Sequence, residues 1–123
     1  MTSDRPVLVL VRRQVRWQLH VRLFGHEYYD LSSRAEIERR SLSSALRRII
    51  REAARGRHHL LAEPIDAYHE AADQRHEKIQ VKCSLITTDF EFLRAQSRIR
   101  GISINSLTRR LVRNWEFMQK NIT

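Results

Sequence analysis

Two stretches of the chain combine serine hydroxyls with arginines at the same spacing, which suits them to binding phosphate. They read SLSSALRRII from Ser41 and SINSLTRRLV from Ser103. A leading serine favours a helix N-cap, and the amide groups at a helix N-terminus lie at the positive end of the helix dipole, where anions bind. Neither stretch has a carboxylate three residues after the serine that would repel phosphate. The candidate phosphate contacts are Ser41, Ser43, Ser44, Ser103, Asn105, Ser106, Arg47 and Arg109.

The two stretches belong to a longer internal repeat. When the chain is shifted by 62 positions, residues 16–54 align with 78–116 without a gap, and nine of the 39 aligned positions are identical. Roughly three identities are expected from unrelated stretches of this composition, so we interpret the repeat as a duplication. The chain then divides into an N-terminal extension (1–15), copy one (16–54), a linker with a short helix (55–77) and copy two (78–120).

Each copy opens with a segment in which polar and apolar side chains alternate. The apolar positions are Leu19, Val21, Leu23, Val81, Cys83 and Leu85. A period of two predicts a β-strand with one buried face. The opposite face then carries side chains that pair with base edges: glutamine with adenine, arginine or lysine with guanine, and serine or histidine more permissively. The candidate base-contacting residues are Gln18, His20, Arg22, Gln80, Lys82 and Ser84.

Two helices follow the strand in each copy. We expect the first at about 27–38 in copy one and 88–100 in copy two, and the second to begin after the capping serine. Gly101 lies between the helices of copy two, which is typical of a helix terminator. Arg39 takes that place in copy one, so we expect Arg39 to adopt a positive φ.

The charge of the chain points to a polyanionic partner. Its 123 residues include 23 Lys and Arg against 14 Asp and Glu, a formal net charge of +9. Small chains this basic commonly bind a polyanion, and a ribosome-associated or merely basic protein is the alternative that charge alone leaves open. The β-branched segment Val7–Val11 is too short to cross a bilayer and is typical of a short strand, and one cysteine excludes an internal disulfide. We therefore expect a cytoplasmic protein that makes no membrane contact.

The tandem order of strand, helix and helix resembles the ribbon-helix-helix (Arc- and MetJ-like) family of DNA-binding proteins, and within it the tandem, TraY-like members. The resemblance is carried by the turn GISINS at 101–106 and by the register that runs from it back to the strand in both copies. It implies a mainly α fold with a short two-stranded antiparallel ribbon. The two copies would form a tandem ribbon-helix-helix pseudo-dimer that shares one core.

The resemblance also implies a function. It implies sequence-specific binding of double-stranded DNA by insertion of the ribbon into the major groove, as a transcriptional regulator, for example a repressor. An accessory role in plasmid conjugation is the alternative, and an antitoxin role is a lesser one because little chain follows copy two. Self-association on DNA and a relaxase or other protein partner stay open. Because the outward strand residues differ between the copies, we expect an asymmetric recognition sequence.

The sequence argues against several other features. In Arc-like members of the family, a buried Arg-Glu-Arg network surrounds the second helix. Only Arg40 keeps a charge among the matching positions here, which are Ile102, Leu107, Leu111, Arg40, Ala45 and Ile49. We therefore expect a mainly apolar core. No paired carboxylates or Ser-His-Asp order suggest an enzyme or a cofactor. The histidines near Cys83 match no zinc-site spacing, so we expect no metal.

Overall fold

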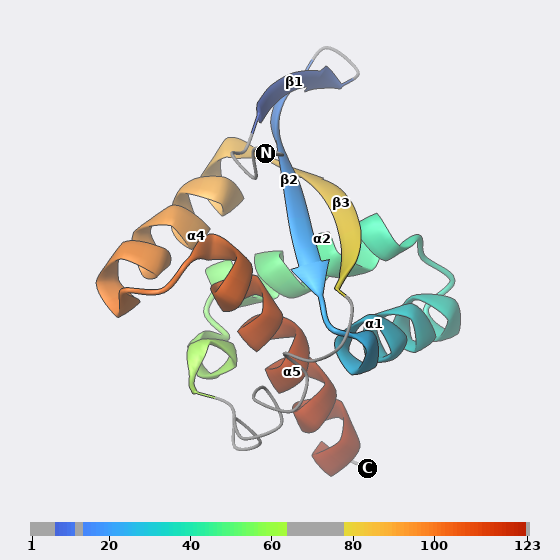
Figure 1. Cartoon of the computed structure of the whole chain (residues 1–123). Coiled ribbons are helices and arrows are strands. Elements are labelled where there is room, and N and C mark those ends of the chain that lie inside the picture. The colour runs from blue at the N-terminus through green and yellow to red at the C-terminus, as the bar shows by residue number, and fades with distance from the viewer. Residues whose placement is uncertain (1–6, 12–13, 64–77, 123) are drawn as a thin grey trace.

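The computed structural model describes residues 7–11, 14–63 and 78–122 (Figure 1). The expected short helix of the linker falls within 64–77, outside the described residues. The elements are β1 (Val7–Val11), β2 (Gln14–Leu23), α1 (Gly25–Ile37), α2 (Leu42–Ala54), the 3-10 helix η1 (His58–Leu61), β3 (Ile79–Leu85), α4 (Thr87–Arg100) and α5 (Ile104–Ile122).

The strands form one antiparallel sheet in the order β1-β2-β3. The first half of the ten-residue β2 pairs with β1 and the second half with β3, while Trp17 and Gln18 pair with both. The expected fold class, mainly α with a two-stranded ribbon in a tandem ribbon-helix-helix pseudo-dimer, is therefore wrong. The described residues combine four α-helices with a three-stranded sheet. The physical reason is that Val7–Val11 needs a partner for its backbone N–H and C=O groups, and the edge of β2 supplies it.

The alternation predicted for β2 and β3 is confirmed. Their six predicted apolar side chains are buried, none more than 5% exposed. They join the apolar faces of α1, α2, α4 and α5 in one core, to which both copies contribute. Figure 1 shows β2 and β3 crossing in front of α2, with α1 and α4 on opposite sides. Each fully buried leucine stabilises this arrangement by about 2 kcal/mol relative to an exposed one.

The turns between the paired helices follow the predicted pattern. Gly101 ends α4 with a φ of 67°, and Arg39 occupies the equivalent place after α1 with a φ of 56°, as expected. In both turns a later N–H reaches back five residues: Arg40 N–H donates to the Ala35 carbonyl at 2.8 Å, and Ile102 N–H donates to the Ser97 carbonyl at 3.2 Å. These bonds satisfy carbonyls that the helix end would leave open.

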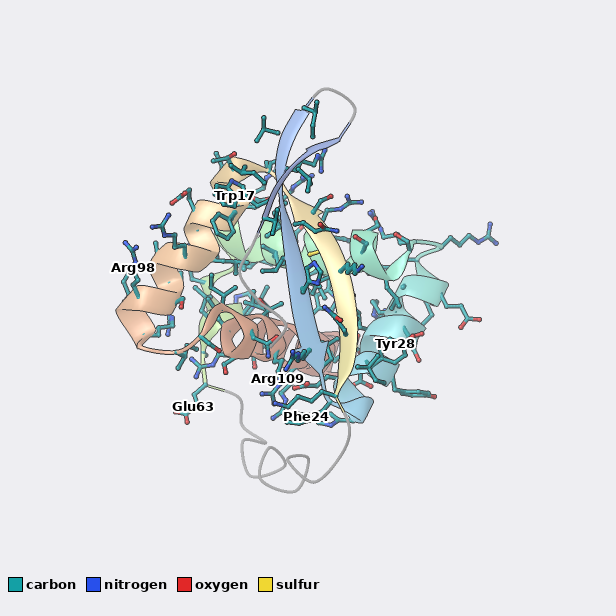
Figure 2. The ribbon with its side chains drawn as sticks, turned by 45° about the horizontal axis from the view of Figure 1, so that its top comes forward. Trp17, Phe24, Tyr28, Glu63, Arg98 and Arg109 are labelled. Carbon is teal, nitrogen blue, oxygen red and sulfur yellow. The ribbon has the colours of Figure 1, made fainter. Side chains whose placement is uncertain are left out.

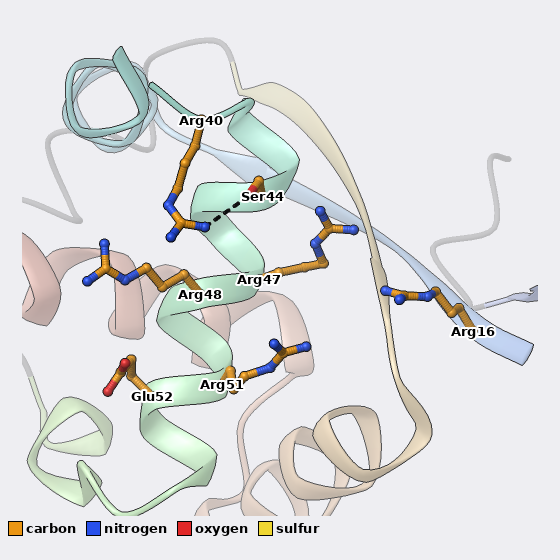
Figure 3. A pocket seen from close by; sticks show the side chains of 7 residues that line it. All are labelled: Arg16, Arg40, Ser44, Arg47, Arg48, Arg51 and Glu52. Carbon is orange, nitrogen blue, oxygen red and sulfur yellow. Dashed lines mark hydrogen bonds between the residues drawn. The ribbon is translucent and has the colours of Figure 1, made fainter. Parts of the chain in front are cut away.

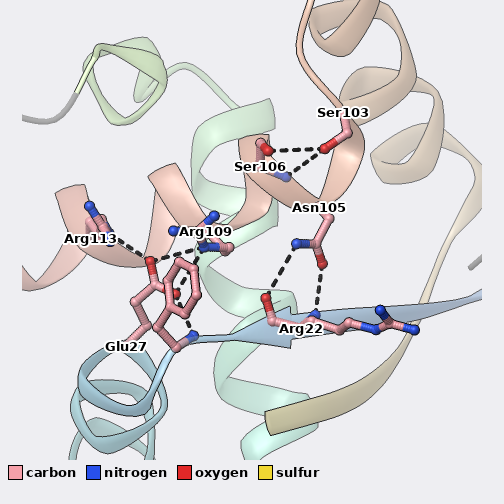
Figure 4. Close-up of polar contacts among 8 residues, drawn as sticks. Arg22, Glu27, Ser103, Asn105, Ser106, Arg109 and Arg113 are labelled. Atoms are coloured by element: carbon pink, nitrogen blue, oxygen red, sulfur yellow. Dashed lines mark hydrogen bonds and ion pairs between the residues drawn. The ribbon is translucent and has the colours of Figure 1, made fainter. Parts of the chain in front are cut away.

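A charged network lies inside the core, so the expectation of a mainly apolar core is incomplete. Glu27, the third residue of α1, has a fully buried side chain and accepts a hydrogen bond from the Phe24 N–H at 2.8 Å. Its carboxylate also accepts from Arg109 Nε at 3.0 and 3.2 Å and from Arg113 Nε at 2.6 Å (Figure 4). Because Glu27 belongs to copy one and both arginines to copy two, this network joins the copies.

β1 exposes apolar side chains along the edge of the sheet. Leu10 is 71% exposed, and Val7 and Leu8 are each more than half exposed, as is Val15 at the start of β2. No described strand pairs with the outer edge of β1. An apolar edge strand of this kind favours contact with another chain.

Candidate nucleic-acid interface

The six predicted base-contacting residues lie on one surface, which we call the polar face. The register of β2 and β3 sets them in three facing pairs, and each pair takes one residue from each copy. All six side chains are exposed or half-buried, because their neighbours along each strand fill the core on the other side. Side chains that face each other across an antiparallel pair stand roughly 5 Å apart. The pairs are Gln18 with Ser84, His20 with Lys82, and Arg22 with Gln80.

Two members of the polar face are bonded to each other across the strands. Gln80 Nε2 lies 2.6 Å from His20 Nδ1, although these residues are diagonal neighbours rather than facing ones. The bond restrains both side chains at the surface. A ligand that uses either of them therefore meets a prepared donor and acceptor pair.

Capped helix N-termini lie beside the polar face. The predicted caps are confirmed: the Ser41 hydroxyl accepts from the Ser44 N–H at 3.1 Å, and the Ser103 hydroxyl accepts from the Ser106 N–H at 3.0 Å. Both capping serines are exposed, and Ser44 and Ser106 are half-buried. The amides that the caps leave open keep the anion-binding potential of the helix ends.

A hollow separates each helix N-terminus from the strands. Their volumes are similar, about 320 Å³ at the start of α5 and about 330 Å³ at the start of α2. Each hollow thus brings a helix N-terminus and polar-face side chains to one concave surface. The hollow at α5 is lined by Leu19, His20, Arg22, Lys78, Ser103, Ile104 and Asn105. The hollow at α2 is lined by Val9, Gln18, Ser43, Lys82, Cys83 and Ser84.

Asn105, a predicted phosphate contact, bonds to the backbone of β2. Its Oδ1 accepts from the Arg22 N–H at 2.7 Å, and its Nδ2 donates to the Arg22 carbonyl at 3.3 Å (Figure 4). The side-chain amide thereby pairs with the edge of β2 as a neighbouring strand would, beyond the part that β1 covers. Asn105 fastens α5 to the strand that carries Arg22, so its amide is already engaged rather than offered to phosphate.

Arg109 is also withdrawn from the surface. It is 6% exposed, lies against Glu27, and its guanidinium stands 4.1 Å from the centre of the Phe24 ring. The structure therefore removes Arg109 from the predicted phosphate contacts. Arg47, the equivalent residue of copy one, stays half-buried on α2 and keeps its place among them.

Two cationic residues beside the polar face were missed by the sequence reasoning. Arg16 lies two residues before Gln18 on β2, so the same alternation, extended by one step, could have found it. Lys78 is its equivalent in copy two and lines the hollow at α5 with Arg22. The ammonium of Lys78 also lies 5.3 Å from the centre of the Phe24 ring.

Cys83 points away from the polar face into the core. Burial raises the pKa of its thiol to about 12, although the positive charge of Arg47 works in the opposite direction. The thiolate is the form that attacks electrophiles and binds metals. Cys83 is therefore an apolar core residue at neutral pH.

No protein-family model, curated protein or solved structure matches the chain. None of the helices in the described ranges is long and apolar enough to cross a membrane. Those ranges also contain no group of three or more His, Cys, Asp or Glu side chains arranged to hold a metal ion.

Proposed function

We propose that this protein binds double-stranded DNA with sequence preference by placing the polar face in the major groove, and that it acts as a transcriptional regulator. The observation that carries the proposal is the set of three facing pairs of hydrogen-bonding side chains on one outward sheet surface. The major groove of B-form DNA admits a two-stranded β-ribbon. The likeness to ribbon-helix-helix proteins seen in the sequence extends, on this proposal, to the way in which DNA is read.

The chemistry of the polar face suits base edges. Gln18 and Gln80 can present an amide to adenine, while Arg22 and Lys82 can donate to guanine N7 and O6. β1 pairs with β2 only as far as Gln18. The part of β2 that carries Arg22 therefore extends beyond the end of β1. The two halves present different groups, and we therefore expect an asymmetric recognition sequence.

The surroundings of the polar face suit the DNA backbone. Each groove-facing strand has a capped helix N-terminus on its flank, where open amides favour phosphate. The net charge of +9 adds long-range attraction that weakens as salt rises. Phosphate contacts would set the position of the protein, and the polar face would choose the sequence.

Selection of binding sites from random duplexes by the full-length protein tests the proposal. We expect an asymmetric site, and we expect Arg22→Ala and Lys82→Ala each to lose about 1–3 kcal/mol of discrimination at one base pair. Arg98→Ala is the matched control, because it removes the same charge from the exposed end of α4 (Figure 2). We expect this control to keep the base preference.

A wild-type protein that enriches no sequence refutes the proposal. So does a loss of affinity in Arg22→Ala and Lys82→Ala that is the same for every sequence, because that pattern indicates phosphate contact rather than base contact. A perfect palindrome bound by one molecule refutes only the expected asymmetry.

The regulatory role has its own test. On this proposal the protein resides in the cytoplasm with the nucleoid or a plasmid. We expect footprinting on the DNA that flanks its own gene to show protection over the promoter. Protection beside a nicking site instead would assign it to plasmid conjugation.

A further inference from the structure

A pocket lined by arginines lies on one side of the sheet, apart from the two hollows. Its volume is about 600 Å³. Figure 3 shows Arg16 reaching toward it from β2 and Arg47 from α2. We call it the arginine pocket, and it is lined by Arg16, Arg40, Ser44, Arg47, Arg48, Arg51 and Glu52.

The carboxylates near the arginine pocket do not cover all of its guanidinium groups. Glu38 binds Arg48 at 2.7 Å and Arg40 at 3.5 Å, and Asp89 faces Arg51 at 3.5 Å. Glu52, the one carboxylate among the lining residues, pairs with Arg57 at 3.4 Å. Arg47 makes no ion pair with any residue that the structure describes. The pocket therefore presents guanidinium groups whose N–H donors suit an anion with several oxygens.

The same positions of copy two show why these arginines stay at the surface. Arg109 and Arg113 are the equivalents of Arg47 and Arg51, and both lie buried against Glu27. Asp89 is the equivalent of Glu27 but is one methylene shorter, and it faces a single arginine.

Two further contacts of the copy-two arginines have no counterpart in copy one. Phe24, which supplies a ring to Arg109, is replaced at the equivalent position by Ile86, so Arg47 has no such aromatic partner there. Arg110, the equivalent of Arg48, donates to the Leu61 carbonyl of η1 at 3.2 Å. The duplicated arginines thus serve the fold in copy two and face an open pocket in copy one.

We propose that the arginine pocket binds the DNA backbone on one flank of the recognition site only, a proposal that rests on the DNA binding proposed above. Arg16 lies two residues before Gln18 and shares the outward side of β2 with it, and the other residues that line the pocket belong to α2 or lie just before it, so the pocket extends from this side of β2 to α2. On the α5 side, Glu27 and η1 engage the equivalent arginines among the described residues, so those guanidinium groups are not offered to DNA in the same way. The protein therefore contacts more phosphates beyond the α2 end of its site than beyond the α5 end.

Hydroxyl-radical footprinting on the selected duplex tests this inference. We expect protection by the wild-type protein to extend further on one side. We expect Arg47→Ala to shorten that side alone, to weaken binding three- to tenfold near 0.1 M salt, and to reduce the slope of log affinity against log salt by about one. Arg98→Ala, with the same change of charge, should leave the length of protection unchanged. Circular dichroism establishes that each variant is folded.

The outcomes separate this inference from the proposed function. A wild-type protein that selects a site but protects both flanks equally overturns the inference and leaves the function standing. Arg47→Ala with an unchanged footprint and salt slope also overturns it. If pyrophosphate binds the wild-type protein but not Arg47→Ala, and the substitution leaves the footprint unchanged, the arginine pocket is a small-molecule site instead and the inference is overturned. A wild-type protein without any site preference removes both proposals together.

Discussion

Removal of the charge on Glu27 should destabilise the fold more than any other single change of an acidic residue in the described structure. Its side chain is fully buried, and those of Arg109 and Arg113 are 7% and 5% exposed. In Glu27→Gln, the amide oxygen can still accept from the Phe24 N–H, so the helix cap survives. Two buried guanidinium groups lose their counter-charge, which costs about 3–5 kcal/mol.

Asp89→Asn provides the matched comparison at the equivalent position. Its partner Arg51 is 41% exposed at a distance of 3.5 Å, so solvent screens the pair and its loss costs about 1 kcal/mol or less. Because domains of this size are stable by only about 5–15 kcal/mol, the two variants should be easy to tell apart.

Urea unfolding followed by circular dichroism measures the difference. With a slope of about 2 kcal/mol per molar, Glu27→Gln should lower the midpoint by roughly 2 M, and Asp89→Asn by under about 0.5 M. Both carboxylates are buried, and the two variants differ in the exposure of the arginine partners. Equal shifts would refute the reasoning, since they would mean that burial of the arginines does not set the cost of losing the carboxylate charge. An unshifted midpoint for Glu27→Gln would show that the network contributes nothing net.

Three further predictions follow from described contacts. Asn105→Ala should cost about 1–3 kcal/mol and speed hydrogen exchange at the Arg22 amide, whereas Ser43→Ala at the equivalent position should not. The folded pKa of Cys83 is raised, so its contribution to stability is present below the unfolded pKa and is lost as pH rises from about 9 toward 12. Chemical denaturation at pH 8 and pH 10.5 should therefore show a larger loss for the wild type than for Cys83→Val. Leu10→Lys should reduce concentration-dependent light scattering, and no reduction would count against the exposed edge of β1 as a contact surface.

The parts of the fold that depend on local pattern could be predicted from the sequence. The alternation of polar and apolar residues predicts the polar face, because a half-buried strand has one apolar and one polar side. The serines marked two helix starts, and alignment with Gly101 identified the positive φ of Arg39. Each of these depends on residues that are close in the chain.

The parts that depend on distant pairing could not be predicted. The apolar content of Val7–Val11 indicates a strand but not which edge it joins, and this segment has no counterpart in the repeat. Glu27 resembles a surface acid in a polar helix, and its partners lie 82 and 86 residues away. Burial of Arg109 depends on its ion pair with Glu27. Arg109, which was expected to contact DNA phosphate, therefore lies in the core instead.

The pairing of β2 with β3 joins the two copies within a single polypeptide. Where separate subunits build such a sheet, dilution dissociates them and a change in the gene alters both halves at once. Here dilution cannot part β2 from β3, because both strands belong to one chain. A codon change at His20 also leaves Lys82 untouched. Each half of the surface can therefore diverge by itself, as the different fates of Arg47 and Arg109 already illustrate.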